Sequence, residues 1–450
     1  MTPPHTPQAA AMAVAAASNI AKSAIAFTAG TGAGNSAFTP RLIFDVSPSI
    51  TRSYFLGHHH AALSRMRQTL SNVGLIIECR DFRVPMTSWN PLLERSLAAN
   101  PTERARIIVY TKRDLGPPNR LPGDAPGQGQ SASEVIQTLR NFHRQHSPAT
   151  EVLFLGTGPA DEERLVTATE RARKRAGSSH KLEPKSGSKS RGRLPPPLAS
   201  AAADVRLLEA IKNVARERDS LTGLRAMVVG MPNAGKSTLL NRLRARGMGL
   251  PKAARTGGQP GITRRLGTPV RIAPGEASDE PGSEGLGEGV FLVDTPGVFI
   301  PYVSAPEDML KLALVGCVKD GLVPALTVAD YLLYHLNLLD PAIYTNRFCD
   351  GVPTNDVHEF LRSVAMRTGK LRRGGEPSLE AAAEWVVQEW RSGRMGRFLL
   401  DEVTPEALVH MVERSNEPVL SMNQARKRDK EARKAKSEMK RLGLSAPDQR

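Results

Sequence analysis

A glycine-rich octapeptide gives the strongest chemical signal in this sequence of 450 residues. Residues 230–237 read GMPNAGKS and match the pattern GxxxxGK followed by Ser or Thr at every fixed position. Such a turn points successive backbone N–H groups at phosphate oxygens, and the helix that follows adds positive potential. Lys236 supplies a mobile cation for β- and γ-phosphates, and Ser237 supplies a hydroxyl to Mg²⁺. The expected nucleotide contacts in this loop are Asn233, Ala234, Gly235, Lys236, Ser237 and Thr238.

Two further segments supply residues that a phosphate loop of this kind requires. The apolar run at 290–293 ends in Asp294-Thr-Pro-Gly297, where the acid can hold the hydration shell of Mg²⁺ and the Gly297 N–H can contact a γ-phosphate. Upstream of it lies the glycine-rich segment 257–263, whose Thr263 can complete the Mg²⁺ shell. Taken singly, these are ordinary turn and loop residues. Their order after the phosphate loop favours two switch segments that sense the nucleotide.

A base-specific motif lies far upstream of the phosphate loop. Residues 111–114 read TKRD and follow the apolar run RIIVY. The Asp114 carboxylate can accept two hydrogen bonds from guanine, and an adenine would leave that acceptor unpaired at a cost of about 1–3 kcal/mol. The Lys112 stem can lie along the base plane. In the usual Ras-like order this motif comes last, but a doubly wound sheet can be cut and rejoined at surface termini while the site assembles from the same strand ends.

These motifs fall in a chain that alternates short apolar segments with helical ones. Strands are expected at 73–79, 105–110, 151–155, 225–229, 268–272 and 290–293, and helices at 90–99, 133–145, 205–218 and 236–246. The strands lack polar alternation, as in a parallel sheet covered on both faces. The pattern predicts an α/β, doubly wound, mostly parallel sheet. After 304 the strands stop, and helices expected at 307–318, 324–337, 356–367, 378–392 and 404–413 predict a separate all-α domain.

Low-complexity and charged segments punctuate the chain. Residues 1–44 contain no Asp or Glu and are rich in Ala, Ser and Thr, which predicts a mitochondrial transit peptide or a disordered terminus without an address. Residues 171–199 are basic and rich in Ser and Pro, which predicts a linker. Residues 274–288 predict an exposed insertion. The basic tail at 416–450 is either a solvated helix or a contact for RNA phosphates.

Composition narrows the classes of partner and site. The chain has 61 Lys and Arg against 45 Asp and Glu, a net charge of +16, which favours polyanionic partners such as RNA, DNA or an acidic membrane surface. The three cysteines Cys79, Cys317 and Cys349 are far apart, which disfavours a disulfide framework and a cysteine-rich zinc site. No run of eighteen apolar residues occurs, so no transmembrane helix is expected.

The order TKRD, GMPNAGKST, PGIT and DTPG resembles that of the circularly permuted GTPases of the YlqF/RbgA group. The resemblance spans about residues 53–415 and includes Gly57-His58, the segment RDFRVP at 80–85 and Asn90-Pro91. The segments LKLAL at 310–314 and VADYLL at 328–333 resemble the branch of mitochondrial ribosome-associated GTPases. The resemblance implies a permuted GTPase domain at 45–303 and a helical domain at 304–415 that binds rRNA. It also implies GTP hydrolysis in assembly of the large mitochondrial ribosomal subunit, stimulated by that particle, in the matrix and peripherally at the inner membrane.

The resemblance also implies roles for individual residues. Thr111 stands where the family usually has Asn, and Gly156-Thr157 stands where a second base-contacting segment usually reads Ser-Ala. His58, the first of three consecutive histidines, maps to the family's motif histidine and is the candidate catalytic residue, with Lys236 and Thr263. Asn233 matches the asparagine that coordinates K⁺ in potassium-activated relatives. Val298 replaces the water-orienting glutamine of Ras-like GTPases, so slow intrinsic turnover is expected.

Other interpretations of the sequence remain open. A GTP-dependent RNA-binding module with negligible turnover would need the same motifs. A P-loop ATPase or small-molecule kinase would share the phosphate loop, but the guanine motif argues against it. The basic patches at 171–175 and 425–436 are similar to nuclear import signals, so a nucleolar or cytosolic ribosome-assembly GTPase is the alternative to a mitochondrial one.

Overall fold

The computed structural model describes residues 38–47, 50, 64, 68–98, 104–119, 129–156, 201–255, 263, 266–277, 282–298, 303, 305–416, 424, 427, 430, 431 and 434. His58, Thr157 and the linker predicted at 171–199 lie outside the described residues, as do most of 1–44 and of the tail. The chain divides into two compact units. The sheet unit comprises Pro48–Arg120, Gln130–Leu322 and Arg397–Arg450, and the helical unit comprises Met1–Ser47, Leu121–Gly129 and Val323–Gly396.

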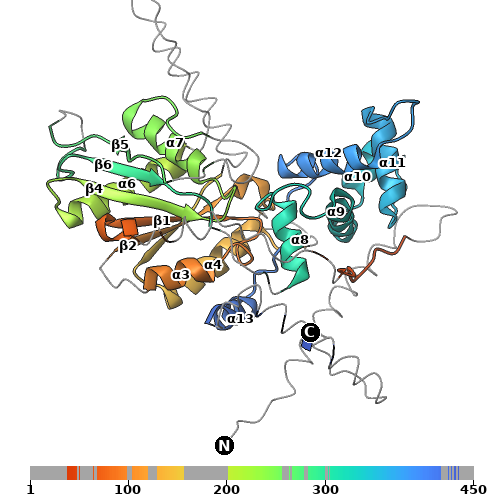
Figure 1. Cartoon of the computed structure of the whole chain (residues 1–450), viewed down its shortest axis with the longest axis horizontal. Coiled ribbons are helices and arrows are strands. Elements are labelled where there is room, and N and C mark those ends of the chain that lie inside the picture. Colours follow the sequence, from red (N-terminus) through yellow and green to blue (C-terminus); the bar gives the residue numbers. More distant parts are fainter. Residues whose placement is uncertain are drawn as a thin grey trace, which may run out of the picture. The chain divides into compact units, whose positions relative to one another are not determined.

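The sheet unit is built on a six-stranded sheet in the order β3-β2-β1-β4-β6-β5 (Figure 1). Its strands are β1 (Leu75–Asp81), β2 (Ala105–Thr111), β3 (Thr150–Phe154), β4 (Leu224–Gly230), β5 (Val270–Ala273) and β6 (Val290–Asp294). Every pair is parallel except β5 with β6. All seven residues of β1 are buried, as expected for the centre of a parallel sheet with both faces covered.

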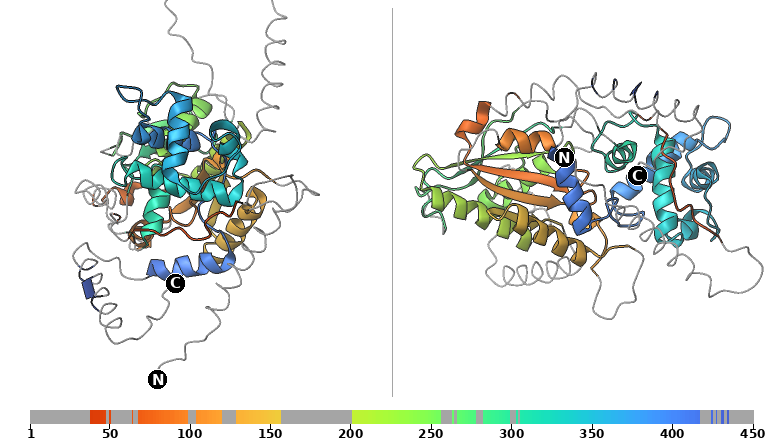
Figure 2. Two further views of the ribbon diagram at one scale, coloured as in Figure 1. Left: turned by 90° about the vertical axis from the view of Figure 1, so that its right-hand side faces the viewer. Right: turned by 90° about the horizontal axis from the view of Figure 1, so that it is seen from below.

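Helices cover both faces of this sheet, as the right-hand view of Figure 2 shows. On one face, α6 (Ala201–Arg218) and α7 (Lys236–Met248) pack with alternate residues of the central strands. On the other face, α3 (Pro91–Ala98) and α4 (Ala132–His146) pack with the intervening residues. The predicted α/β doubly wound architecture is confirmed. The strand order also places β2, with the TKRD motif at its end, two positions from β4, which leads into the phosphate loop.

Two helices after 304 belong to the sheet unit, which differs from the domain boundary expected from the sequence. α8 (Pro306–Leu314) buries five of its nine residues in this unit. α13 (Pro405–Asn416) buries Leu408 in the same apolar cluster as Val135 and Leu139 of α4. The contact boundaries therefore fall at 322/323 and 396/397, because the apolar faces of α8 and α13 are completed by the sheet unit.

The helical unit contains α9 (Ala325–Leu339), α10 (Ala342–Phe348), α11 (Val357–Thr368) and α12 (Leu379–Arg391). The residues described at 38–47 pack against α9: Arg41 forms an ion pair with Asp330 at 2.6 Å, and the Phe44 ring lies 5.2 Å from that of Tyr331. Part of the segment predicted as a targeting sequence therefore has a structural partner. None of the described helices is long and apolar enough to cross a membrane.

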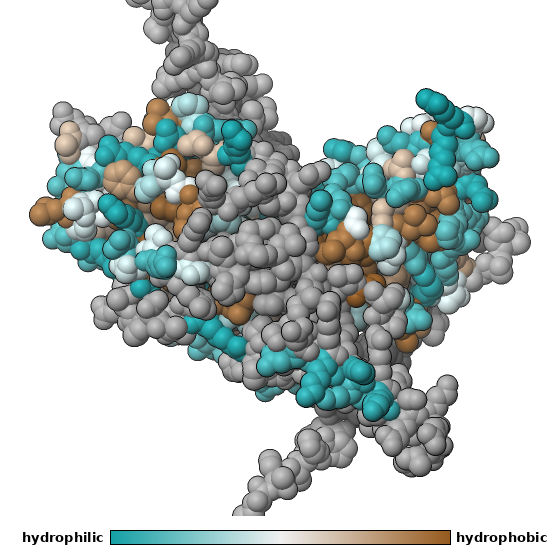
Figure 3. Space-filling model, in the orientation of Figure 1, coloured by the Kyte–Doolittle hydropathy of each residue, from teal (hydrophilic) through white to brown (hydrophobic). Residues whose placement is uncertain are grey.

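Exposed apolar side chains are scattered rather than gathered. On the face shown in Figure 3, hydrophobic residues form small groups that hydrophilic residues border. Among the described residues, the large apolar side chains that stay exposed are spread over both units: Leu42, Ile43, Val205, Leu221, Leu250, Val352, Met366, Leu371 and Val409. Single exposed apolar residues of this kind are normal in folded proteins.

Candidate nucleotide-binding site

The site forms where neighbouring parallel strands end. β1, β2, β4 and β6 end at Asp81, Thr111, Gly230 and Asp294, and their hydrogen-bonded registers bring these carboxyl ends to one edge of the sheet. Open α/β sheets bind ligands at this edge.

The phosphate loop has the backbone conformation that its glycines allow. Gly230 and Gly235 have φ angles of 140° and 87°, and a Cβ at Gly230 would lie 2.3 Å from the Cys79 carbonyl oxygen. Lys236 is buried, and its Nζ donates to the carbonyl oxygens of Gly230 at 3.1 Å and Met231 at 2.7 Å. Burial lowers the pKa of Lys236 from its usual 10.5, and Asp294 opposes that shift. The loop thus wraps around the ammonium group that is expected to meet the phosphates.

Three oxygen-bearing side chains predicted for Mg²⁺ lie together. Ser237 Oγ donates to Asp294 Oδ2 at 2.5 Å and lies 3.3 Å from Thr263 Oγ1, which is itself 3.4 Å from Asp294 Oδ2. Asp294 is 4% exposed, and its Oδ1 is buried without a hydrogen-bond partner among the described residues. An orphaned carboxylate oxygen beside two hydroxyls is a hard donor set that fits Mg²⁺.

The loop after β6 packs directly on the phosphate loop. A Cβ at Gly297 would lie 2.5 Å from the Pro232 Cα, so only glycine fits this position. The Val298 N–H donates to the Gly230 carbonyl at 3.2 Å, and Thr295 Oγ1 donates to the Val228 carbonyl at 2.7 Å. The two segments predicted to contact the γ-phosphate are therefore neighbours.

The base-specific motif reaches the phosphate loop through Thr111. Its Oγ1 donates to the Ala234 carbonyl at 2.8 Å, and its side chain lies next to Gly235. Lys112 adopts φ 58° and its Nζ donates to Asp81 Oδ2 at 2.9 Å. The threonine at the usual asparagine position thus links the two motifs, which are 123 residues apart at this contact.

Asp114 lies in the short 3-10 helix η3 (Arg113–Leu115), against Gly156. A Cβ at Gly156 would lie 2.5 Å from the Asp114 backbone nitrogen and 3.0 Å from its Oδ1. Any side chain at position 156 would therefore crowd Asp114. Burial raises the pKa of Asp114, and a backbone hydrogen bond and nearby arginines oppose the shift. Asp114 and Gly156, predicted to contact the same base, are therefore adjacent.

Comparison with known proteins identifies the family. A family model described as "50S ribosome-binding GTPase" matches residues 225–337. Mitochondrial GTPase 1 of Schizosaccharomyces japonicus is 35% identical over 356 residues, which cover 79% of this chain and 91% of that protein. This chain belongs to the mitochondrial GTPase 1 family. Mitochondrial GTPase 1 of Schizosaccharomyces pombe is 32% identical, with 83% and 96% covered, and Mitochondrial ribosome-associated GTPase 1 of Ictalurus punctatus is 27% identical, with 80% and 96% covered.

As a member of the mitochondrial GTPase 1 family, the chain is a GTP hydrolase, as its motifs predicted. Val298, at the position of the water-orienting glutamine, is only 1% exposed. Its side chain packs in a cluster with Ile76, Leu93 and Met227. This residue therefore belongs to the apolar core and cannot orient a water molecule.

Several residues around the GTPase site were not assigned a role from the sequence. Arg83 donates to both carboxylate oxygens of Asp81, at 3.0 and 2.8 Å, and Lys112 donates to the same group. Although burial alone would raise the pKa of Asp81, these two cations hold it well below its usual value. The signal in the sequence was the charged segment RDFR at 80–83, directly after the strand expected at 73–79. Asp81 thereby fixes the amino group of a lysine expected to line the base.

The buried thiols near the GTPase site are poor nucleophiles at neutral pH. Burial raises the pKa of Cys79 to about 12 and that of Cys317 to about 11. Both thiols stay protonated at neutral pH, and a thiol is a far weaker nucleophile than a thiolate. They act as packing residues beside the phosphate loop.

Proposed function

We propose that this GTPase hydrolyses GTP to GDP and phosphate during assembly of the large mitochondrial ribosomal subunit, and that this particle stimulates its turnover. Relatives named Mitochondrial ribosome-associated GTPase 1, from Ictalurus punctatus and Mus musculus, are 27% and 29% identical and support a ribosomal partner. The net charge of +16 suits an RNA-rich particle. We place the protein in the mitochondrion, bound peripherally to the matrix side of the inner membrane.

The observation that carries this proposal is the contrast between assembled nucleotide-binding motifs and a buried Val298. Thr111 joins the guanine motif to the phosphate loop at 2.8 Å, which supports a nucleotide site that is assembled within this chain. Val298 cannot orient the attacking water, because its side chain lies in the core. A GTPase built in this way turns over slowly until a partner completes the catalytic arrangement.

The proposed roles follow from where each side chain lies. Lys236 binds the β- and γ-phosphates, while Asp114, Lys112, Gly156 and Thr157 bind guanine. Ser237, Thr263 and Asp294 hold Mg²⁺, which neutralises negative charge on the phosphate oxygens when bound. The Gly297 N–H contacts the γ-phosphate. Asn233 coordinates K⁺, and His58 assists the attack of water.

The test is single-turnover hydrolysis of GTP with and without purified large mitochondrial subunits. Stimulation by about 100-fold or more is expected, in line with GTPases that need a partner for catalysis. The Lys236→Ala variant should bind no GTP in either condition, and Arg206→Ala, at an exposed position of α6, is its control. If the particle binds in a GTP-dependent way without raising the rate, the chain is instead an RNA-binding module with negligible turnover.

Location is tested separately with fluorescent fusions that carry or lack residues 1–44. Mitochondrial import that is lost with this segment is the expected result. Accumulation of both fusions in the nucleolus would favour the nucleolar alternative, in which the basic patches act as import signals.

A further inference from the structure

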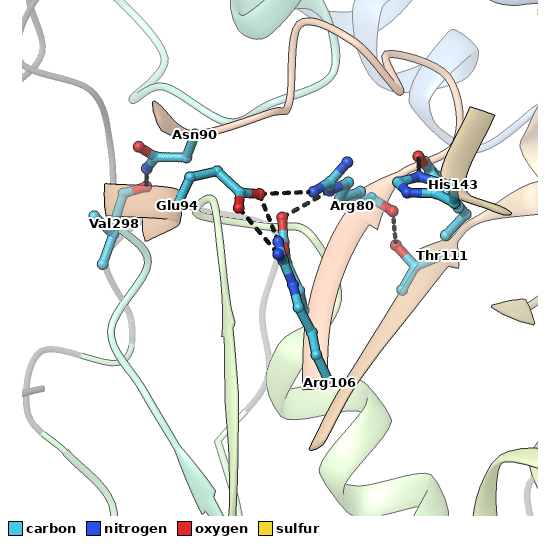
Figure 4. Close-up of polar contacts among 9 residues, drawn as sticks. Arg80, Asn90, Glu94, Arg106, Thr111, His143 and Val298 are labelled. Atoms are coloured by element: carbon cyan, nitrogen blue, oxygen red, sulfur yellow. Dashed lines mark hydrogen bonds and ion pairs between the residues drawn. The ribbon is translucent and has the colours of Figure 1, made fainter. Parts of the chain in front are cut away.

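Asn90 is a buried residue that joins two segments far apart in the chain (Figure 4). It is 1% exposed and precedes α3. Its Oδ1 accepts from the Leu92 N–H at 3.0 Å, which caps the helix, and its Nδ2 donates to the Val298 carbonyl at 2.8 Å. The amide oxygen therefore orders the start of α3, and the amide nitrogen holds the backbone directly after the DTPG segment.

The backbone around Val298 is fixed on both sides. Its N–H donates to the Gly230 carbonyl of the phosphate loop at 3.2 Å, and its own carbonyl accepts from Asn90. Its side chain packs with Leu93 of α3. Gly297 is the next residue towards the N-terminus, so its place against Pro232 depends on how firmly Val298 is held.

Asn90 itself is held in place by charged groups on two strands. Glu94, one helical turn further along α3, pairs with Arg80 Nη2 at 3.3 Å and with Arg106 (Figure 4). The Arg80 guanidinium lies 4.1 Å from the ring of Trp89, the residue before Asn90. A cation over an aromatic face and a partly buried ion pair thus fix the chain on both sides of Asn90.

We propose that Asn90 is a positioning residue that tunes the response of this GTPase to the γ-phosphate. By holding the Val298 carbonyl, it keeps the Gly297 N–H where the γ-phosphate of GTP would meet it. GDP has no γ-phosphate, so Asn90 raises affinity for GTP over GDP and supports hydrolysis without contributing to the binding of guanine. This inference rests on the role proposed for Gly297, but not on a ribosomal partner.

The test is the Asn90→Ser variant of the full chain. Serine is a good helix cap but is too short to reach the Val298 carbonyl, so the substitution removes one hydrogen bond and keeps the other. Affinities for GDP and for a GTP analogue with an imido β–γ bridge are measured by fluorescence titration. The ratio of analogue to GDP affinity is expected to fall about tenfold, and single-turnover hydrolysis without ribosomes is expected to slow by a similar factor. Affinity for GDP should stay within about twofold.

The matched control is Ser131→Ala, which removes the cap of α4 in the same unit. It should lower the melting temperature, with the affinity ratio as in the wild type. The proposal is overturned if Asn90→Ser keeps the wild-type ratio, or if GDP and analogue weaken equally, which would mark a purely structural residue. Because both affinities are measured without ribosomes, a failure of ribosomal stimulation would count against the proposed function alone.

Discussion

At the scale of single residues, Asp114 decides which base the site accepts. Asp114→Asn should weaken GTP by about 100-fold and favour xanthosine triphosphate, because an amide can donate to the oxygen that replaces the guanine amine. Competition titrations with both nucleotides measure this. Asp219→Asn, an exposed substitution between α6 and β4, is the control. An unchanged preference for GTP would remove Asp114 from the base site.

The protonation of Asp114 adds a pH dependence to guanine binding. Only the ionised carboxylate accepts both hydrogen bonds from guanine. Burial raises the pKa of Asp114 above its usual 3.8, so affinity for GTP should begin to fall at a higher pH than an exposed aspartate would give. Titration of GDP binding from neutral pH downwards, with Asp114→Asn as the insensitive reference, follows this loss.

Asn233 is the residue through which K⁺ is expected to act. It adopts φ 55°, and its Nδ2 donates to the Gly316 carbonyl at 2.7 Å, which turns the amide oxygen away from that carbonyl. Hydrolysis should be about tenfold faster in K⁺ than in Na⁺ at equal ionic strength, since a bound cation offsets developing charge. Asn233→Gly tolerates the positive φ and should abolish the difference. Equal rates in both salts for the wild type would rule out this role.

At the scale of helices and strands, strong apolar patterns could be predicted and weak ones could not. The six strands lie within about two residues of the expected segments, since each is a short apolar run in a covered sheet. α10 escapes prediction because its seven residues, AIYTNRF, are too few to show a helical period. The antiparallel direction of β5 could have been predicted: the sequence between the two strands was expected to be a loop, its described residues form no helix, and a parallel pair needs a crossover.

The residues of the nucleotide-binding site also fall into those that a local sequence pattern predicts and those that it does not. The phosphate loop and the DTPG segment can be recognised in the sequence because their function requires fixed spacing within a few residues. The partnership of Asn90 with Val298 spans 208 residues, and no local pattern shows which distant carbonyl an asparagine will meet. Glu78 and Arg80 alternate along a strand, which predicts opposite charges on one face of β1 but not their burial.

That buried ion cluster should dominate the stability of the central strands. Glu78 is 2% exposed and pairs with Arg80 at 2.7 Å and with Arg106. Glu78→Gln leaves the arginines without their buried counter-charge and should cost about 3 kcal/mol of unfolding free energy at pH 7. Urea unfolding measures the loss, and Glu209→Gln, in an exposed pair with Lys212, should cost less than about 0.5 kcal/mol. Equal effects of the two substitutions would contradict this.

The pH dependence of the same cluster has a definite sign. Burial alone would raise the pKa of Glu78, but Arg80 and Arg106 lower it from 4.5 to about 2. A carboxylate with a lowered pKa stabilises the fold above its unfolded-state value and loses that contribution as pH falls through the folded-state value. The difference between wild type and Glu78→Gln should therefore be full above about pH 5 and shrink towards pH 2.

At the scale of the whole molecule, the sheet unit includes a stretch, residues 397–416, that follows the helical unit in the chain. Asp401 accepts from the Met86 N–H at 2.9 Å and from the Thr87 N–H at 2.8 Å, and it lies 3.4 Å from Lys311. Val403 and Leu408 are each 1% exposed in the cluster that covers β2 and α4. Asp401 lies more than 300 residues away from Met86 and Thr87, so no local sequence pattern predicted this contact.

Truncation tests whether this returning stretch belongs to the fold of the sheet unit. A chain ending at Gly396 loses four buried apolar side chains, Phe398, Leu400, Val403 and Leu408, and the hydrogen bonds of Asp401, together on the order of 10 kcal/mol. Its melting temperature should fall by more than about 10 °C, measured by calorimetry with GDP present. A chain ending at Asn416 keeps α13 and loses only the basic tail, so it should melt within about 2 °C of the full chain. If both truncations melted alike, α13 would be an appendage of the sheet unit rather than part of its core.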